Sequence, residues 1–248
     1  MKKYLLILFL FLSQLSIVKA ADNRYYELRV YYCNPGKLEA LITRFRDHAV
    51  PLFKKHGIEG LGYWVPTKSS DNSFYYLMSY PNKEARDASW KAFAADPEWK
   101  EAARKSEENG KLVAKAETYF LKTTDYSPKF KASKSGELST FEMRIYTAKP
   151  EKLPNLESRF RDHTMKIFKN MGMKNIIYFT TIESDPSVQP KLLYFLSHKN
   201  EAAAKLSWAN FRKDPEWIKA STESEANGKL VEKVEAVYMQ GMDFSMLK

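Results

Sequence analysis

The sequence predicts an α+β protein made of two fused copies of one ferredoxin-like βαββαβ unit. The main observation is an internal repeat, in which the string Arg44–His48 recurs unchanged as Arg159–His163, at an offset of 115 residues. The neighbouring string 26–31 recurs in similar form as 141–146 at the same offset. A repeat of this length is too long for a solenoid unit and indicates duplication of a whole small domain.

The repeat continues through the second half of each copy with a slightly larger offset. Trp90 matches Trp208, and the string Asp96–Trp99 matches Asp214–Trp217, both at an offset of 118 residues. The second copy therefore carries three extra residues, which we place in the loop around 185–187.

The two copies show the same order of elements, read from hydrophobic periodicity. In the first copy the predicted elements are a strand over 24–32, a helix over 36–55, strands over 58–66 and 73–80, a helical region over 82–109 and a strand over 112–121. Gly57 is placed to end the first helix. Asp96 and Pro97 indicate an N-cap and a new first turn within the second helical region.

A βαββαβ unit carries both helices on one face of an antiparallel sheet, so its other face must be covered. Two copies in one chain can cover each other, sheet face to sheet face. The expected organisation is a signal peptide over 1–20, a first repeat over 21–125, a polar linker over 126–137 and a second repeat over 138–248.

The first 20 residues have the composition of a secretory signal peptide. Lys2 and Lys3 precede an apolar run that is shorter than the about 20 residues needed to span a bilayer, and small Ala20 precedes the expected cut. We therefore expect an exported protein, periplasmic or secreted, without a transmembrane segment after cleavage. Loss of three lysines lowers the formal charge from +10 to +7, without a long basic run, which does not favour a nucleic-acid partner.

The single cysteine, Cys33, cannot form an internal disulfide, and its counterpart in the second copy is Ala148. We interpret it as a structural residue. The sequence has no phosphate-binding glycine loop, no Gly-x-Ser-x-Gly elbow and no zinc-protease helix motif. We accordingly expect neither a cofactor nor a metal.

Several motifs, taken together, resemble the NIPSNAP family. They are the Glu-Leu-Arg-x-Tyr strand at 27–31, the Arg-Phe-Arg-Asp-His string, Gly-Tyr-Trp at 62–64 and the string 96–99 after Trp90. The resemblance implies a dimeric α/β-barrel type of fold, in which two ferredoxin-like sheets enclose a cavity. It implies no particular reaction. The wider barrel class includes cofactor-free monooxygenases, haem-degrading enzymes and small-molecule binders, and fold alone does not choose among them.

Strand alternation places Leu28 and Val30 on one face and the polar residues of the same strand on the other. If the apolar set faces the helices, the polar set faces the cavity between the repeats. The candidate ligand-binding residues on this argument are Glu27, Arg29, Tyr31, Glu142, Arg144, Tyr146, Lys115, Glu117, Lys233 and Glu235, with Tyr63 and Trp64 as aromatic lining. The alternative is an ion-pair network that joins the two sheets, because buried charges must be paired.

His48 and His163 are weaker candidates. Each lies three residues after a phenylalanine and borders the apolar stripe of its helix. A histidine packed in the core and hydrogen-bonded to a neighbour is the favoured interpretation. The repeated tryptophans are interpreted as core anchors: Trp90, Trp99, Trp208 and Trp217.

Three functions remain as hypotheses. The first is a small-molecule binding protein, non-enzymatic or of unrecorded activity, with its site between the repeats. The second is a cofactor-free monooxygenase or a haem-degrading type of enzyme. The third is a protein-interaction module that uses its helical exterior. The internal pseudo-dimer makes a monomer plausible, although exposed strand edges allow further homo-oligomers.

Overall fold

The computed structural model describes residues 22–248 except 69 and 134–138, so the expected signal peptide lies outside the described residues. The first repeat contains β1 (Tyr25–Cys33), α1 (Leu38–Arg44), the π-helical turn η1 (Phe45–Ala49), α2 (Val50–Lys55), β2 (Glu59–Pro66), β3 (Ser73–Tyr80), α3 (Lys83–Ala95), α4 (Pro97–Ser106) and β4 (Val113–Thr123). The second contains β5 (Thr140–Ala148), α5 (Leu153–Arg159), η2 (Phe160–Thr164), α6 (Met165–Asn170), β6 (Lys174–Thr181), β7 (Lys191–His198), α7 (Glu201–Phe211), α8 (Pro215–Ser224) and β8 (Val231–Gly241).

The predicted order of elements is confirmed in both repeats. The helix break is confirmed as well, because the side chain of Asp96 accepts a hydrogen bond from the Glu98 amide and Pro97 opens α4. The three extra residues lie where they were expected: the loop 182–190 is three residues longer than the matching loop 67–72.

The first predicted helix differs from the expectation at its centre. The Val50 amide donates to the carbonyl of Phe45, five residues back, so the turn Phe45–Ala49 is π-helical. The same turn occurs at Phe160–Thr164 in the second repeat. A π turn holds one residue more than an α turn, and such turns occur frequently at functional sites.

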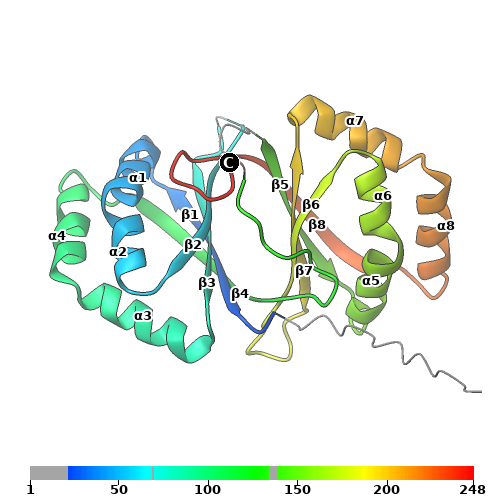
Figure 1. The fold of residues 1–248 in the computed structure, drawn as a ribbon, viewed down its shortest axis with the longest axis horizontal. Coiled ribbons are helices and arrows are strands. Elements are labelled where there is room, and N and C mark those ends of the chain that lie inside the picture. Colours follow the sequence, from blue (N-terminus) through cyan, green and yellow to red (C-terminus); the bar gives the residue numbers. More distant parts are fainter. Residues whose placement is uncertain (1–21, 69, 134–138) are drawn as a thin grey trace, which may run out of the picture.

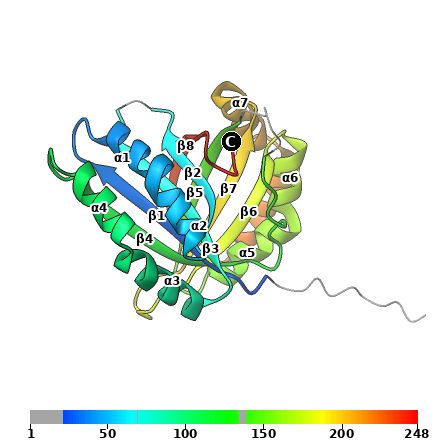
Figure 2. The same ribbon diagram turned by 60° about the vertical axis from the view of Figure 1, so that its left-hand side comes forward.

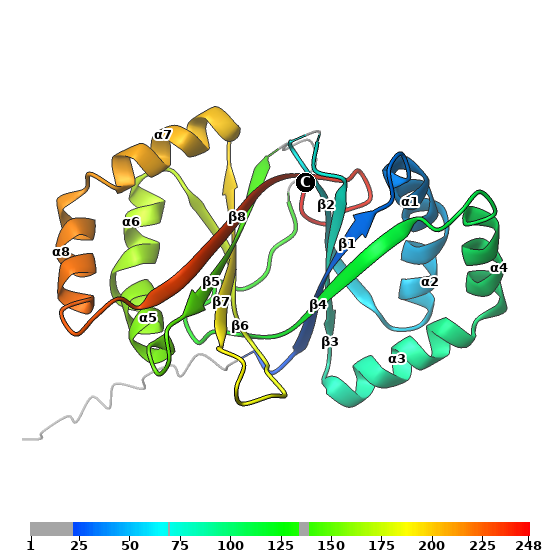
Figure 3. The ribbon, with the colours of Figure 1, turned by 180° about the vertical axis from the view of Figure 1, so that it is seen from behind.

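All eight strands close into one antiparallel barrel in the order β1-β3-β2-β8-β5-β7-β6-β4. Each repeat supplies four strands, and the two joints between repeats are short. β4 pairs with β6 through Leu121–Thr123, and β8 pairs with β2 through Met239–Gly241. Figure 1 shows the strands in the middle and the helices of each repeat on its own outer side. Figure 3 shows the long strands β4 and β8 running from one repeat toward the other.

Apolar side chains of both sheets fill the space between them. Leu28, Val30 and Leu77 of the first repeat belong to one cluster with Met143 and Phe195 of the second. Each repeat has a further core between its sheet and its helices, centred on Phe45 in the first and Phe160 in the second. No helix in the described part of the chain is long and apolar enough to cross a membrane.

After β4 and β8 the chain continues onto the other repeat, and we call the segments 124–127 and 242–245 the crossing arms. The backbone amide of Thr124 donates to the carbonyl of Tyr178 in β6, and Met242 makes the matching bond to Tyr63 in β2. Ser127 Oγ accepts from the Tyr178 amide and Ser245 Oγ accepts from the Tyr63 amide, each at 3.0 Å. Each repeat is thus bonded to the end of the other.

We expect Ser245→Ala to lower the free energy of unfolding by about 1–3 kcal/mol, because it leaves the buried Tyr63 amide without that partner. Ser127→Ala should have a similar effect through Tyr178. Ser187→Ala, in the exposed loop 182–190, is the control and should stay within about 0.5 kcal/mol. Urea unfolding measures all three, and equal stability of the three variants would show that the crossing arms do not contribute.

Candidate functional site

The polar face of β1 lies against the helices and not in the space between the repeats. Glu27 is fully buried and accepts hydrogen bonds from Arg86 Nε at 2.8 Å and from Trp90 Nε1 at 2.9 Å, both on α3. Arg29 Nε donates to the same carboxylate at 2.7 Å. Tyr31 packs edge-on against Phe45 of η1. The expectation that these three β1 residues line an inter-repeat cavity is therefore wrong.

The second repeat builds a similar network, in which His198 is a partner and Ala204 stands at the position of Arg86. Glu142 accepts from Arg144 Nη1 at Oε1 and from Trp208 Nε1 at Oε2, each at 2.7 Å. His198 Nε2 lies 2.9 Å from the same Oε2. Tyr146 packs against Phe160 on the helix side. Its placement in an inter-repeat cavity, and that of Glu142 and Arg144, is likewise wrong.

The physical reason is the nature of the two sides. The helices offer indole and guanidinium donors to a buried carboxylate, whereas the side chains of the two sheets that cluster around Leu28 and Val30 are apolar. Alternation along the strand was correctly inferred, but the apolar set faces the other repeat. The alternative interpretation, an ion-pair network that joins the two sheets, is wrong for these residues as well, because each network joins a sheet to the helices of its own repeat.

Two further candidates lie on opposite sides of the same strand. Trp64 points between the repeats, where it is fully buried and stacks on Phe195 at 5.2 Å between ring centroids. Tyr63 lies on the helix side, parallel to Tyr76, so its expected place in the inter-repeat cavity is wrong.

The remaining candidates form two local ion pairs on the inner side of β4 and β8. Lys115 Nζ lies 2.6 Å from Glu117, and Lys233 Nζ lies 2.8 Å from Glu235. Glu117 also accepts from the Tyr32 and Tyr119 hydroxyls. The hydrogen bond from Lys115 is the main cause that lowers the pKa of Glu117. Ligand binding by these two pairs stays a prediction.

In the repeated string Arg44–His48, the first three side chains have structural contacts and the last two do not. Arg44 is buried and donates from Nη1 to Ser106 Oγ at 3.3 Å and to Glu107 Oε1 at 3.1 Å, which fixes α4. Phe45 is a core residue. Arg46 contacts the second crossing arm, with Nε 3.5 Å from Asp243. Asp47 and His48 make no side-chain hydrogen bond or ion pair within the described residues.

The interpretation of His48 as a core histidine is wrong. Because the π turn adds a residue between Phe45 and Ala49, both of those stay buried while the three residues between them are exposed. His163 is exposed by the same turn in the second repeat.

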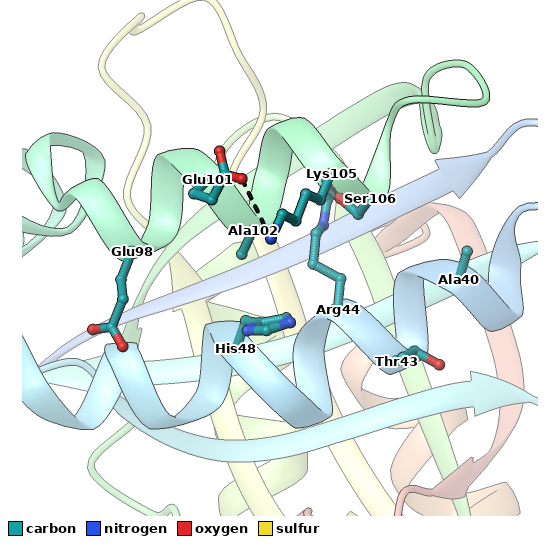
Figure 4. A pocket seen from close by; sticks show the side chains of 9 residues that line it. All are labelled: Ala40, Thr43, Arg44, His48, Glu98, Glu101, Ala102, Lys105 and Ser106. Atoms are coloured by element: carbon teal, nitrogen blue, oxygen red, sulfur yellow. Dashed lines mark hydrogen bonds and ion pairs between the residues drawn. The ribbon is translucent and has the colours of Figure 1, made fainter.

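His48 borders a groove between the first helix pair and α4, which we call the helical groove. Figure 2 shows α4 running alongside α1 and α2. The groove has a volume of about 540 Å³. Its lining residues are Ala40, Thr43, Arg44, His48, Glu98, Glu101, Ala102, Lys105 and Ser106. Figure 4 shows Arg44 and His48 pointing from one wall toward α4, where Lys105 lies 3.4 Å from Glu101.

Six polar lining residues of the helical groove were not among the predicted site residues: Thr43, Arg44, Glu98, Glu101, Lys105 and Ser106. Four of them lie on α4, which reaches His48 only because the chain turns back at Asp96. The Asp-Pro break was the signal in the sequence from which these residues could have been predicted to lie near His48.

The described residues contain no group of three or more His, Cys, Asp or Glu side chains arranged to hold a metal ion. Cys33 is buried, and burial raises the pKa of its thiol to about 11. A thiol held in its neutral form is a poor nucleophile, in keeping with the structural interpretation of Cys33.

The fold defines the class of protein. Two ferredoxin-like units close one eight-stranded antiparallel barrel within a single chain, which is the intramolecular form of a dimeric α/β barrel. The NIPSNAP family model matches residues 26–128 and 141–246, once in each repeat. The chain belongs to the NIPSNAP family.

The chain is 32% identical to the protein NipSnap homolog 3A of Homo sapiens and of Pongo abelii, over 126 residues. That segment is 50% of this chain and 49% of either relative, so the match spans about half the length of these proteins. A proposed monooxygenase from Fusobacterium nucleatum aligns with a TM-score of 0.60 at 11% identity, over 89% of this chain and 93% of that one. An anthrone oxidase-like protein aligns with a TM-score of 0.60 at 10% identity, over 89% and 92%. Likeness at this identity shows the fold alone.

The carboxylates of Glu27 and Glu142 predict a loss of stability in acid. Burial would raise the pKa of each, but hydrogen bonds and positive charge from Arg86 and Arg29, or from His198, Trp208 and Arg144, hold both pKa values below the usual range. A group whose pKa is lowered by folding stabilises the fold above its unfolded pKa of about 4.3, and this contribution is lost as pH falls.

We therefore expect the free energy of unfolding to decrease from about pH 5 downward. Glu27→Gln should remove part of this pH dependence and lower stability at pH 7 by about 3–5 kcal/mol, because Arg29 and Arg86 lose their buried counter-ion. Urea unfolding at a series of pH values measures both effects. An unchanged acid slope in Glu27→Gln and in Glu142→Gln would contradict the assignment.

Proposed function

We propose that this NIPSNAP protein binds a small organic molecule in the helical groove of its first repeat. The observation that carries the proposal is the position of His48: the π turn directs it outward into the groove, where none of the described residues satisfies its ring nitrogens. The groove volume of about 540 Å³ lies in the range of small-molecule sites. We place the site in this groove, and not between the repeats as expected from the sequence, because apolar side chains cluster in the barrel interior.

The charges of the groove limit the chemistry of the ligand. Arg44 is committed to Ser106 and Glu107, and Lys105 is paired with Glu101. Glu98 is paired with Lys55. The charged groups of the groove walls are therefore already paired with groups of opposite charge. This favours a neutral or zwitterionic ligand over a polyanion. His48 and the hydroxyl of Thr43 remain to donate and accept hydrogen bonds, and Ala40 and Ala102 add apolar lining.

A cofactor-free oxygenase is the second candidate function. A histidine in a pocket with free ring nitrogens can take a proton from a phenol or an enol, the step that prepares such a substrate for reaction with oxygen. The proposed monooxygenase and the anthrone oxidase-like protein have the same fold. Oxygen consumption by the purified protein with a phenol or quinol separates this function from binding alone.

Native mass spectrometry of the purified protein, followed by denaturing release and identification of any bound compound, tests ligand binding directly. A fragment screen by ligand-observed NMR extends the test to ligands that do not survive purification. We expect His48→Ala to weaken a hit by about fivefold or more, the value of one or two lost hydrogen bonds.

Asp47→Ala is the matched control, since Asp47 lies in the same π turn but does not line the groove. It should leave affinity unchanged. Equal affinity of the native protein and His48→Ala for every hit would place the ligand elsewhere and refute the role of the groove.

We further propose that the chain is exported with cleavage after Ala20, on the composition of residues 1–20. We expect the intact mass of protein recovered from the periplasm or medium of a bacterial host to correspond to a chain beginning at Ala21. Recovery only of the full-length chain inside the cell would contradict the proposal.

A further inference from the structure

Two strands of the barrel keep one edge that no other strand covers. β4 pairs with β1 along most of its length, but with β6 only through residues 121–123. β8 likewise pairs with β5 along most of its length and with β2 only through residues 239–241. Among the described residues, the second edge of 115–119 and of 233–237 has no strand partner. We call these two segments the open edges.

Both open edges are accessible, and they occupy equivalent places in the two repeats. Residue 116 corresponds to residue 234, and each lies in the first half of its strand. Ala116 and Thr118 are exposed, and the apolar side chain of Val234 is 47% exposed. Figure 3 shows β4 and β8 on the same side of the molecule. This side therefore presents two rows of backbone N–H and C=O groups to an additional strand.

The side chains of the open edges follow a Lys-x-Glu pattern. Lys115 and Glu117 lie on the inner side of β4, and Lys233 and Glu235 lie on the inner side of β8. When two identical strands pair antiparallel about one residue, the residue before it in one strand lies opposite the residue after it in the other. Pairing about residue 116 therefore sets lysine against glutamate twice. Pairing about residue 234 does the same.

The same register also matches the other face of each strand. Side chains alternate between the two faces of a strand, so Ala116 and Val234 point away from the charged residues. Pairing about these positions sets Ala116 against its own copy and Val234 against its own copy. The exposed Val234 side chain would then be covered by another valine. One register thus satisfies both the charges and the apolar side chains.

Charged residues on an edge strand commonly prevent pairing, because an incoming strand leaves their charge without a partner. That argument does not apply to a second copy of this chain, since the copy brings the opposite charge to each position. Neither open edge contains proline. The β-bulges fall outside them, between residues 113 and 115 and between residues 231 and 233. The pattern therefore favours a second copy over an unrelated strand.

We propose that the open edges form a homodimer interface, in which β4 pairs with β4 of a second copy and β8 pairs with β8. A single twofold axis through residues 116 and 234 produces both pairings, since the two segments are related by the internal repeat. Two short strand pairs make a small interface, and its ion pairs are screened by salt. We therefore expect a reversible dimer that weakens as salt is added. The interface shares no residue with the helical groove.

Sedimentation velocity of the purified full chain at increasing concentration tests the oligomeric state. We expect a shift from monomer to dimer, and a return toward monomer when salt is added. Hydrogen exchange at low and high concentration locates the interface, and amides of 115–119 and 233–237 should exchange more slowly in the dimer. A monomer at every concentration, or slower exchange confined to other segments, would overturn the proposal.

Charge reversal tests the register. Glu117→Lys combined with Glu235→Lys sets lysine against lysine in both strand pairs and should weaken dimerisation by about tenfold or more. Lys115→Glu combined with Lys233→Glu sets glutamate against glutamate and should have the same effect. A mixture of the two double variants restores opposite charges at each position and should form a heterodimer about as tight as the native dimer. Absence of the heterodimer would contradict the register, provided that both variants keep the native melting temperature.

Two single variants decide the outcome if the double variants do not fold. Glu117→Lys also removes the acceptor of the Tyr32 and Tyr119 hydroxyls, whereas Val234→Lys leaves those bonds in place. Val234→Lys sets two lysines together at the twofold axis and should weaken the dimer by about fivefold or more. Ile218→Lys, at an equally exposed apolar position on α8, is the matched control and should leave dimerisation unchanged. The opposite result, with only Ile218→Lys disrupting the dimer, would place the interface on the helices and overturn the proposal.

Discussion

Mutual burial of two apolar sheet faces is the interaction on which the rest of this structure depends. Neither sheet has helices on its inner side, so Leu28 and Val30 are removed from water by packing in one cluster with apolar side chains of the other repeat, such as Met143 and Phe195. This constraint directs every charged residue of β1 and β5 toward the helices. There the carboxylates of Glu27 and Glu142 receive donors from arginine and tryptophan. The ion-pair networks are therefore a consequence of how the sheets pack, and they hold each helix layer to its own sheet.

Much of the fold could be predicted from the sequence because duplication makes weak local signals appear twice. The element order, the break at Asp96 and the extra residues near 185–187 were all readable. The orientation of β1 was not, since alternation separates two faces without saying which one is covered by a second sheet. The π turn at Phe45 was also hidden, because its residues have ordinary helical character and only the hydrogen-bond pattern distinguishes it. That one turn accounts for the misplacement of His48.

The repeats have diverged where the fold tolerates it. Tyr80 of the first repeat corresponds to His198 of the second, and Arg86 corresponds to Ala204, although both networks remain centred on a buried glutamate. The same freedom applies at Gly60 and Asn175: Asn175 accepts a hydrogen bond from its tyrosine, whereas at Gly60 the tyrosine ring occupies the place of a side chain. A duplicated chain can keep one copy for stability while the other changes. Comparing the two halves of this chain therefore separates residues that the architecture needs from residues that it does not.

The short joint between β2 and β8 has a consequence for the order of events during synthesis. Residues 64–66 of β2 pair with residues 239–241 of β8. This edge of the first sheet therefore stays unpaired until residue 241 has left the ribosome. Pairing over such a separation in sequence is slow, because the entropy of closing a long loop is lost before any stabilising contact forms. Barrel closure is consequently a late, whole-chain event, and the first half is not a finished unit when the second half emerges. The nascent chain therefore stays open for longer than two independent domains would.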